Sequence, residues 1–123
     1  MRRKMTGKQA ILEMLKAEGI KNIFGTPGTS EARLIDMLGD YPELRYFLTL
    51  QESVAMGMGE SYARATEKPS FVSLHVDSGL ANGIALMLDA LNTGTPMVIT
   101  SACLLYTSDA ADDTPCVDLG GRR

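Results

Sequence analysis

Residues 44–64 read LRYFLTLQESVAMGMGESYAR, an apolar run followed at once by a run of small residues. The first seven residues have the length and composition of a buried strand, and the last twelve favour a helix. Gln51 and Glu52 stand at the junction. Because ligands of open parallel sheets bind beyond the carboxyl ends of the strands, Glu52 is a candidate ligand-binding residue. The alternative is a carboxylate that only stabilises the amino end of its helix.

The same order of strand, turn and helix occurs twice more. Residues 22–31 read NIFGTPGTSE, and residues 69–82 read PSFVSLHVDSGLAN. The three strand-to-helix corners carry Thr29, Glu52 and His75. Since the carboxyl ends of parallel strands lie at one edge of a sheet, we expect these three residues along that edge.

Helices and strands alternate along the whole chain. A capping box at Thr6 and Gln9 predicts the start of the first helix, and Gly19 its end. Strands that alternate with helices of this length are typical of an α/β fold, with a parallel sheet flanked by helices. The further elements expected are strands near 21–25, 44–50, 70–75 and 97–100, and helices near 30–38, 52–65 and 80–91.

Composition excludes several classes of protein. The net charge of −3 and a mean hydropathy close to zero indicate neither a nucleic-acid footprint nor a membrane-spanning segment. The basic residues at positions 2–4 are not followed by an apolar segment, as a signal peptide would require. We therefore expect a cytoplasmic protein with no nucleic-acid or membrane partner.

The last part of the chain differs from the rest. Residues 103–123 have no helical or strand periodicity and resemble translated sequencing-adapter read-through. A genuine flexible C-terminus is the alternative. Both cysteines, Cys103 and Cys116, lie there at a spacing that fits no metal motif. We predict a partial domain over residues 1–102, followed by a tail over residues 103–123.

Three motifs, taken in order, carry a resemblance to a known family. They are residues 24–28 (FGTPG), a glutamate before a small-residue helix that ends in residues 60–63 (ESYA), and residues 79–82 (GLAN). The chain resembles, from roughly Thr6 to Ser101, the N-terminal pyrimidine-binding domain of thiamine-diphosphate-dependent 2-oxoacid enzymes, with benzoylformate decarboxylases the nearest match. The resemblance implies thiamine diphosphate as the cofactor.

The resemblance implies catalytic roles for two residues. Glu52 matches the glutamate that hydrogen-bonds the pyrimidine N1′ and activates the cofactor. His75 matches the histidine of benzoylformate decarboxylases that transfers protons to and from the reacting molecule. A core histidine bonded to a backbone carbonyl is the alternative for His75.

The resemblance also implies binding residues. Thr29 falls where benzoylformate decarboxylases carry a serine that contacts the substrate carboxylate, although a helix N-cap would explain it equally well. Gly25, Pro27 and Gly28 match the loop near the pyrimidine ring at the subunit interface. Asn82 matches the asparagine of a family turn, for which helix capping is again the alternative.

The predicted activity is that of a longer protein. A 2-oxoacid decarboxylase of this family releases CO₂ and an aldehyde, and its C-terminal domain binds Mg²⁺ and the diphosphate through a Gly-Asp-Gly…Asn motif. Nothing in this chain resembles that motif, so we expect the fragment alone to be inactive and the full-length protein to be a homo-oligomer, a dimer or tetramer.

Three other functions stay open. The first is an acetolactate synthase-like carboligase, against which His75 and the residues 77–79 (DSG), in place of Gly-Pro-Gly, both argue. The second is an α-subunit of a split decarboxylase, completed by a separate chain. The third is a non-catalytic α/β interaction module, which the presence of both Glu52 and His75 disfavours.

Overall fold

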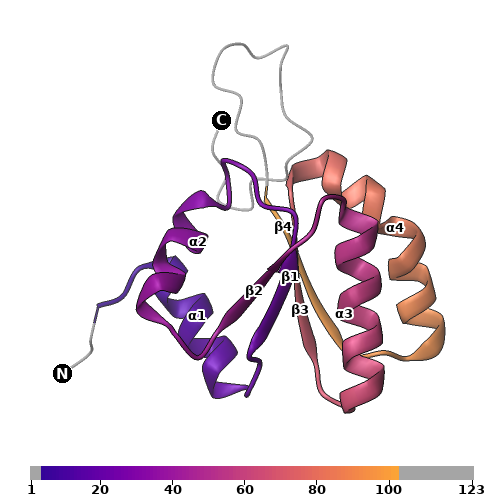
Figure 1. The fold of residues 1–123 in the computed structure, drawn as a ribbon, viewed down its shortest axis with the longest axis horizontal. Helices are drawn as coiled ribbons and strands as arrows, with labels where there is room; N and C mark the ends of the chain where they lie inside the picture. Colours follow the sequence, from indigo (N-terminus) through magenta and orange to yellow (C-terminus); the bar gives the residue numbers. More distant parts are fainter. Residues whose placement is uncertain (1–3, 103–123) are drawn as a thin grey trace, which may run out of the picture.

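The computed structural model describes residues 4–102, which form a four-stranded parallel sheet with helices on both faces (Figure 1). This confirms the predicted α/β class. The strands lie in the order β2-β1-β3-β4. Their bounds are Asn22–Gly25 (β1), Arg45–Leu48 (β2), Ser70–Leu74 (β3) and Met97–Ser101 (β4). The helices are α1 (Gly7–Ala17), α2 (Ala32–Met37), the 3₁₀ helix η1 (Leu38–Asp40), α3 (Glu52–Thr66) and α4 (Val76–Thr93).

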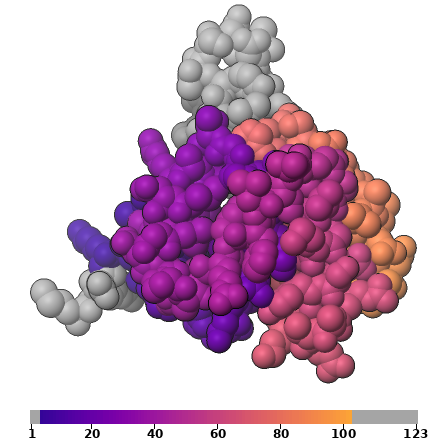
Figure 2. All heavy atoms as spheres, viewed as in Figure 1, coloured from indigo at the N-terminus to yellow at the C-terminus, as the bar shows by residue number. Residues whose placement is uncertain are grey.

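Two hydrophobic cores lie on opposite faces of the sheet. Because successive side chains of a strand point to opposite faces, Ile23 packs on one side and Phe24 on the other. The first core joins β1 and β3 to α1, and the second joins them to α3 (Figure 1). In the space-filling view, side chains of α2, β2 and α3 close the space that the ribbons leave open (Figure 2). The buried residues are Leu12, Leu15, Ile20, Ile23, Tyr41, Leu44 and Phe71 in the first core, and Phe24, Ala55, Met56, Val72 and Leu74 in the second.

The connections between strands change direction at the centre of the sheet. After β1 the chain passes through α2 to β2 on one side, and α3 then returns it across β1 to β3. The next connection, α4, leads outward to β4. Adjacent strands β1 and β3 thus send the chain in opposite directions, and open α/β sheets bind ligands at the carboxyl ends of such a strand pair.

Most predicted element boundaries agree with the structure, including the capping box, in which the Thr6 amide donates to the side chain of Gln9 at 2.9 Å. Helix α4 is the main exception. It begins at Val76, four residues before the predicted start, so residues 79–82 are helical and not a turn. The prediction was wrong because Gly79 was interpreted as a turn residue, whereas no proline interrupts this segment and a helix accepts its small residues.

Two further sequence-based predictions concern a membrane-spanning segment and the C-terminal tail. Within residues 4–102, no helix is long and apolar enough to cross a membrane. The tail predicted over residues 103–123, with both cysteines, lies outside the described residues.

Candidate active site

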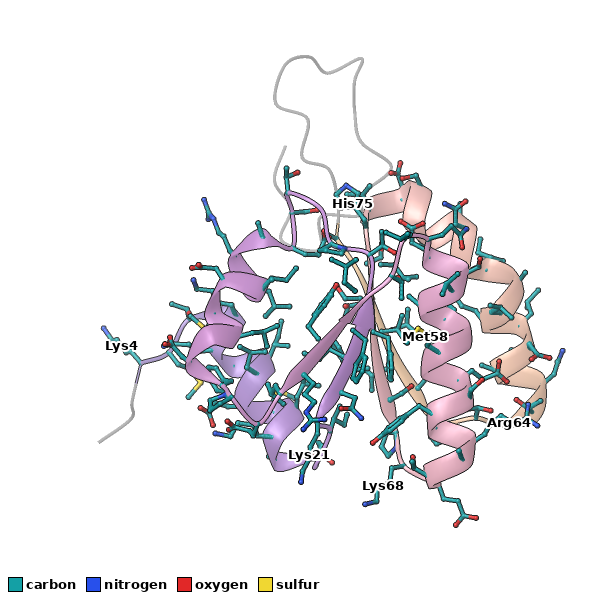
Figure 3. The ribbon with its side chains drawn as sticks, in the orientation of Figure 1. Lys4, Lys21, Met58, Arg64, Lys68 and His75 are labelled. Atoms are coloured by element: carbon teal, nitrogen blue, oxygen red, sulfur yellow. The ribbon has the colours of Figure 1, made fainter. Side chains whose placement is uncertain are left out.

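A histidine and a carboxylate meet at the carboxyl ends of β1 and β3. His75 follows the last residue of β3, and Glu31 ends the turn that follows β1. The imidazole Nδ1 lies 2.8 Å from Oε2 of Glu31, and the Glu31 side chain is only 5% exposed. Figure 3 shows His75 at the carboxyl edge of the sheet, close to the start of α4.

The Glu31 carboxylate is held by further donors. The amide of Gly28 donates to Oε2 at 2.9 Å, and the hydroxyl of Ser30 donates to Oε1 at 2.9 Å. Burial raises the pKa of the Glu31 carboxyl, but hydrogen bonds from His75, Gly28 and Ser30 outweigh burial, so the pKa lies below its usual value. Glu31 is therefore ionised near neutral pH and acts only as an acceptor.

Two glycines allow the backbone to approach this edge closely. A Cβ atom on Gly28 would collide with the imidazole ring of His75. A Cβ atom on Gly25 would collide with the hydroxyl of Tyr46 and lie 2.5 Å from the carbonyl oxygen of Ser73. Burial, followed by the charge of Glu31, raises the pKa of Tyr46 to about 12, so this phenol stays neutral.

Glu52 forms a second, separate cluster. It is the first residue of α3, where the side chain of Gln51 caps the helix by accepting from the Ser53 amide at 2.8 Å. The Glu52 residue is 9% exposed, and its Oε2 accepts from Asn82 Nδ2 at 3.1 Å. Among residues 4–102, Asn82 alone hydrogen-bonds to this carboxylate, so Oε1 keeps its acceptor capacity for a ligand.

Helix α4 leaves room for Glu52 because of a glycine. A Cβ atom on Gly79 would lie 3.0 Å from both Cγ and Oε1 of Glu52, closer than side chains normally pack. Gly79 and Asn82 thus contact the carboxylate from successive turns of one helix. Glu52 and Asn82, which the resemblance assigns to the cofactor, are in contact, and Asn82 lies within α4, neither in a turn nor at a helix cap.

The other predicted site residues lie around these clusters. Thr29 is exposed in the turn before α2, and it makes no hydrogen bond within the described part of the chain. Its alternative role as a helix cap is wrong, because α2 begins at Ala32 and its N-cap is Glu31. Pro27 is half-buried beside Gly28.

Sequence reasoning missed the most heavily bonded residue of the site. Glu31 was treated as part of a helix start, and Ser30 as the first residue of that helix. The available signal was an acidic residue within a strand-to-helix turn of the same kind that carries Thr29. Nothing in a single sequence pairs it with a histidine 44 residues further along.

Comparison with known proteins shows the family of this domain. The family described as thiamine pyrophosphate enzyme, N-terminal TPP binding domain, matches residues 5–112. The chain belongs to this family. The resemblance predicted from the motifs is confirmed, and the match overlaps the first ten residues of the predicted tail.

The relatives of this thiamine pyrophosphate enzyme domain include two activities. Benzoylformate decarboxylase of Pseudomonas aeruginosa is 37% identical over 97 residues, which cover 78% of this chain and 18% of that protein. A Mycobacterium tuberculosis protein provisionally named as an acetolactate synthase large subunit is 40% identical over 95 residues, covering 77% of this chain and 18% of that protein. The chain therefore spans about a fifth of the length of these relatives.

A solved structure has the same fold. The thiamine diphosphate-dependent 4-hydroxybenzoylformate decarboxylase of Rhodococcus jostii matches with a TM-score of 0.75 and 28% identity. The match covers 80% of this chain and 18% of that one.

The residues of the site fit part of thiamine diphosphate. Glu52 offers a nearly buried carboxylate with one oxygen held by Asn82 and the other open to a hydrogen bond from a ring nitrogen. In contrast, residues 4–102 contain no group of three or more histidine, cysteine, aspartate or glutamate side chains that could hold a metal ion. The expected Mg²⁺ remains a prediction about another domain.

Proposed function

We propose that the protein to which this domain belongs is a thiamine-diphosphate-dependent 2-oxo acid decarboxylase. The observation that supports this most is the placement of His75 at the carboxyl end of β3, in contact with the turn that follows β1. Within residues 4–102, every hydrogen bond of its ring involves Nδ1, and the side chain remains 31% exposed. Nε2 is thus the ring nitrogen left for a substrate.

Each residue of the site has a separate task in this proposal. When bound, thiamine diphosphate supplies the nucleophilic carbon that adds to the keto group and accepts the electrons left by departing CO₂. Glu52 would hold the pyrimidine ring of the cofactor, and Asn82 fixes the Glu52 carboxylate through Oε2. His75 delivers and removes protons at Nε2, and Thr29 binds the substrate carboxylate.

The loop after β1 brings the backbone close to the site. In this proposal Gly25, Pro27 and Gly28 lie near the pyrimidine ring, as the family resemblance implies, and the absence of a side chain at Gly28 lets the loop pack against His75. The same loop carries Glu31 to the imidazole. One turn therefore serves both the cofactor and the proton-transferring residue.

An acetolactate synthase-like carboligase is the second candidate, favoured by the Mycobacterium tuberculosis relative. The two activities begin with the same addition to a 2-oxo acid and differ in what ends the cycle. A decarboxylase adds a proton, whereas a carboligase adds a second carbonyl compound. A histidine beside the site suits protonation, so His75 favours the decarboxylase.

Product analysis separates the candidates. The intact protein is supplied with thiamine diphosphate, Mg²⁺ and either benzoylformate or pyruvate, and the products are identified by chromatography. An aldehyde with CO₂ supports the decarboxylase, and a 2-hydroxy-2-methyl-3-oxo acid from pyruvate supports the carboligase. Cofactor binding without turnover of either acid would support the interaction module and contradict both enzymes.

Two controls address the remaining alternatives. We expect the 123-residue chain alone to release no CO₂. Recovery of activity after mixing with a separate pyrophosphate-binding chain would identify a split decarboxylase. We further propose a cytoplasmic location and a dimeric or tetrameric intact protein, which cell fractionation and light scattering would test.

A further inference from the structure

We infer that Glu31 is a positioning residue that fixes His75 in the Nδ1–H tautomer and leaves Nε2 as the proton-exchanging nitrogen. The role of Nε2 rests on the proposed function. The tautomer itself does not, because it follows from contacts within this domain.

The tautomer follows from the chemistry of the two partners. Oε2 of Glu31 lies 2.8 Å from Nδ1, and an ionised carboxylate accepts but cannot donate. A neutral imidazole carries a hydrogen on only one of its two nitrogens, so the nitrogen that donates to Glu31, Nδ1, must carry it. The lowered pKa of Glu31 keeps the carboxylate ionised near neutral pH. The hydroxyl of Ser30, 3.3 Å from Nδ1, donates to Glu31 and does not compete for the ring.

The carboxylate is itself immobilised. Gly28 and Ser30 bind it from the turn, at 2.9 Å each, before His75 is considered. A carboxylate held at both oxygens presents its remaining acceptor direction to the imidazole in a single orientation. Gly28 also packs against the imidazole ring, at a distance that leaves no space for a Cβ atom.

The backbone of His75 is held as firmly as its ring. The amide of Gly79 donates to the His75 carbonyl at 2.8 Å. The next residue, Val76, has a φ of 46°, a conformation rare for a β-branched side chain. Its carbonyl accepts from the hydroxyl of Ser101 at 2.6 Å. Strained conformations of this kind persist where surrounding contacts impose them, and they cluster at functional sites.

The ion pair differs from the others in the described residues. Lys16 pairs with Glu43 at the exposed surface, and Arg64 pairs with Glu60 within one helix. Glu31, with 5% of its side chain exposed, pairs instead with a histidine that comes from another part of the chain, and an imidazole is the basic side chain that exchanges protons most readily near neutral pH. Such an arrangement is better explained by control of the histidine than by stability alone.

The test is a spectroscopic measurement on the 123-residue chain. His75 is the only histidine, so the imidazole ¹⁵N signals need no assignment. Two-bond ¹H–¹⁵N correlation spectra at alkaline pH, where imidazoles are neutral, distinguish the two tautomers. We expect the Nδ1–H pattern in the unmodified chain, a mixed pattern in Glu31→Ala, and recovery of the Nδ1–H pattern in Glu31→Gln, whose amide oxygen still accepts.

A matched control tests whether removal of a carboxylate that does not contact His75 changes the spectrum. Glu43→Gln removes a carboxylate next to β2, at the opposite edge of the sheet, and should leave the spectrum unchanged. An Nε2–H pattern in the unmodified chain would overturn the inference without any variant, so it stays testable even if Glu31→Ala does not fold. An unchanged Nδ1–H pattern in folded Glu31→Ala would overturn it as well.

The result is independent of the proposed activity. No cofactor or turnover is needed for the spectra, so a confirmed tautomer with no decarboxylation by the intact protein would contradict the proposed function alone. An Nε2–H pattern in an active decarboxylase would contradict the inference alone.

Discussion

Glu31 and Glu52 lie at the same edge of the sheet and are both nearly buried, yet they are bonded differently. Glu31 accepts from a backbone amide, a hydroxyl and an imidazole. Glu52 accepts from Asn82 alone among the described residues, with Gly79 packed against it. Both oxygens of Glu31 thus have hydrogen-bond partners within the domain, whereas Oε1 of Glu52 has none among the described residues and can accept from a ligand.

Because their hydrogen bonds differ, substitutions of the two glutamates should affect different properties of the protein. A saturated carboxylate stabilises the fold that presents its donors. A carboxylate with one oxygen free of hydrogen-bond donors contributes less to stability, and that oxygen can bind a ligand. Changes at Glu52 should therefore affect catalysis most, and changes at Glu31 should affect stability most.

The largest expected effect is that of Glu52→Gln on the intact enzyme. The glutamine amide keeps the shape of the glutamate side chain, but unlike a carboxylate it cannot accept and return a proton of the cofactor. Loss of such a group lowers kcat/KM by about 10²–10⁴-fold. Initial rates of CO₂ release measure the effect, and circular dichroism confirms the fold. A rate within about threefold of the unmodified enzyme would contradict the role of Glu52 as cofactor activator.

For folding stability, in contrast to catalysis, substitution of Glu31 should have a larger effect than substitution of Glu52. Glu31→Ala leaves buried donors without their acceptor and should lower the free energy of unfolding by about 1–3 kcal/mol. Glu52→Ala releases only Asn82, which can turn to solvent, and removes a favourable helix-start charge, so its cost should stay below about 1 kcal/mol. Urea denaturation of the 123-residue chain measures both. A larger loss for Glu52→Ala would invalidate the contrast.

A smaller effect distinguishes two helical glycines. Gly57→Ala on α3 adds a Cβ atom at 3.6 Å from Leu86 Cδ1, an ordinary contact, and should stabilise the helix by up to about 1 kcal/mol. Gly79→Ala on α4 gains the same propensity but presses on Glu52 at 3.0 Å, so we expect no net gain. Thermal unfolding compares the two. Equal stabilisation would mean that Glu52 moves aside freely.

The sequence predicted Glu52 and the sheet because both depend on local pattern. An apolar run that ends in a polar pair before a small-residue helix is enough to place Glu52 at the first residue of α3. Asn82 was expected at the site, within a turn formed by residues 79–82. Their helical conformation depends on packing of α4 against α3, which a single sequence does not display.

Glu31 could not be predicted for a different reason. Its partner His75 comes from a strand that pairs with β1 only because the order is β2-β1-β3-β4. That order is a property of the whole sheet, and a sequence of alternating helices and strands is compatible with several orders. The strand ends were predictable, and which ends lie side by side was not.

The smallest expected effect is a change with pH in the stability that Glu31 contributes to the fold. Its pKa is lower in the folded chain than the usual 4.5, so the folded state binds fewer protons than the unfolded state at acid pH. The stabilisation is therefore complete above the usual carboxyl pKa and is lost as pH falls through the folded-state pKa. The free energies of unfolding of the unmodified chain and Glu31→Gln, measured by urea titration, should differ above the usual carboxyl pKa, and the difference should shrink as the pH falls through the folded-state pKa of Glu31. A difference that grows in acid would mean that burial dominates the pKa of Glu31 and that its three donors do not hold the charge.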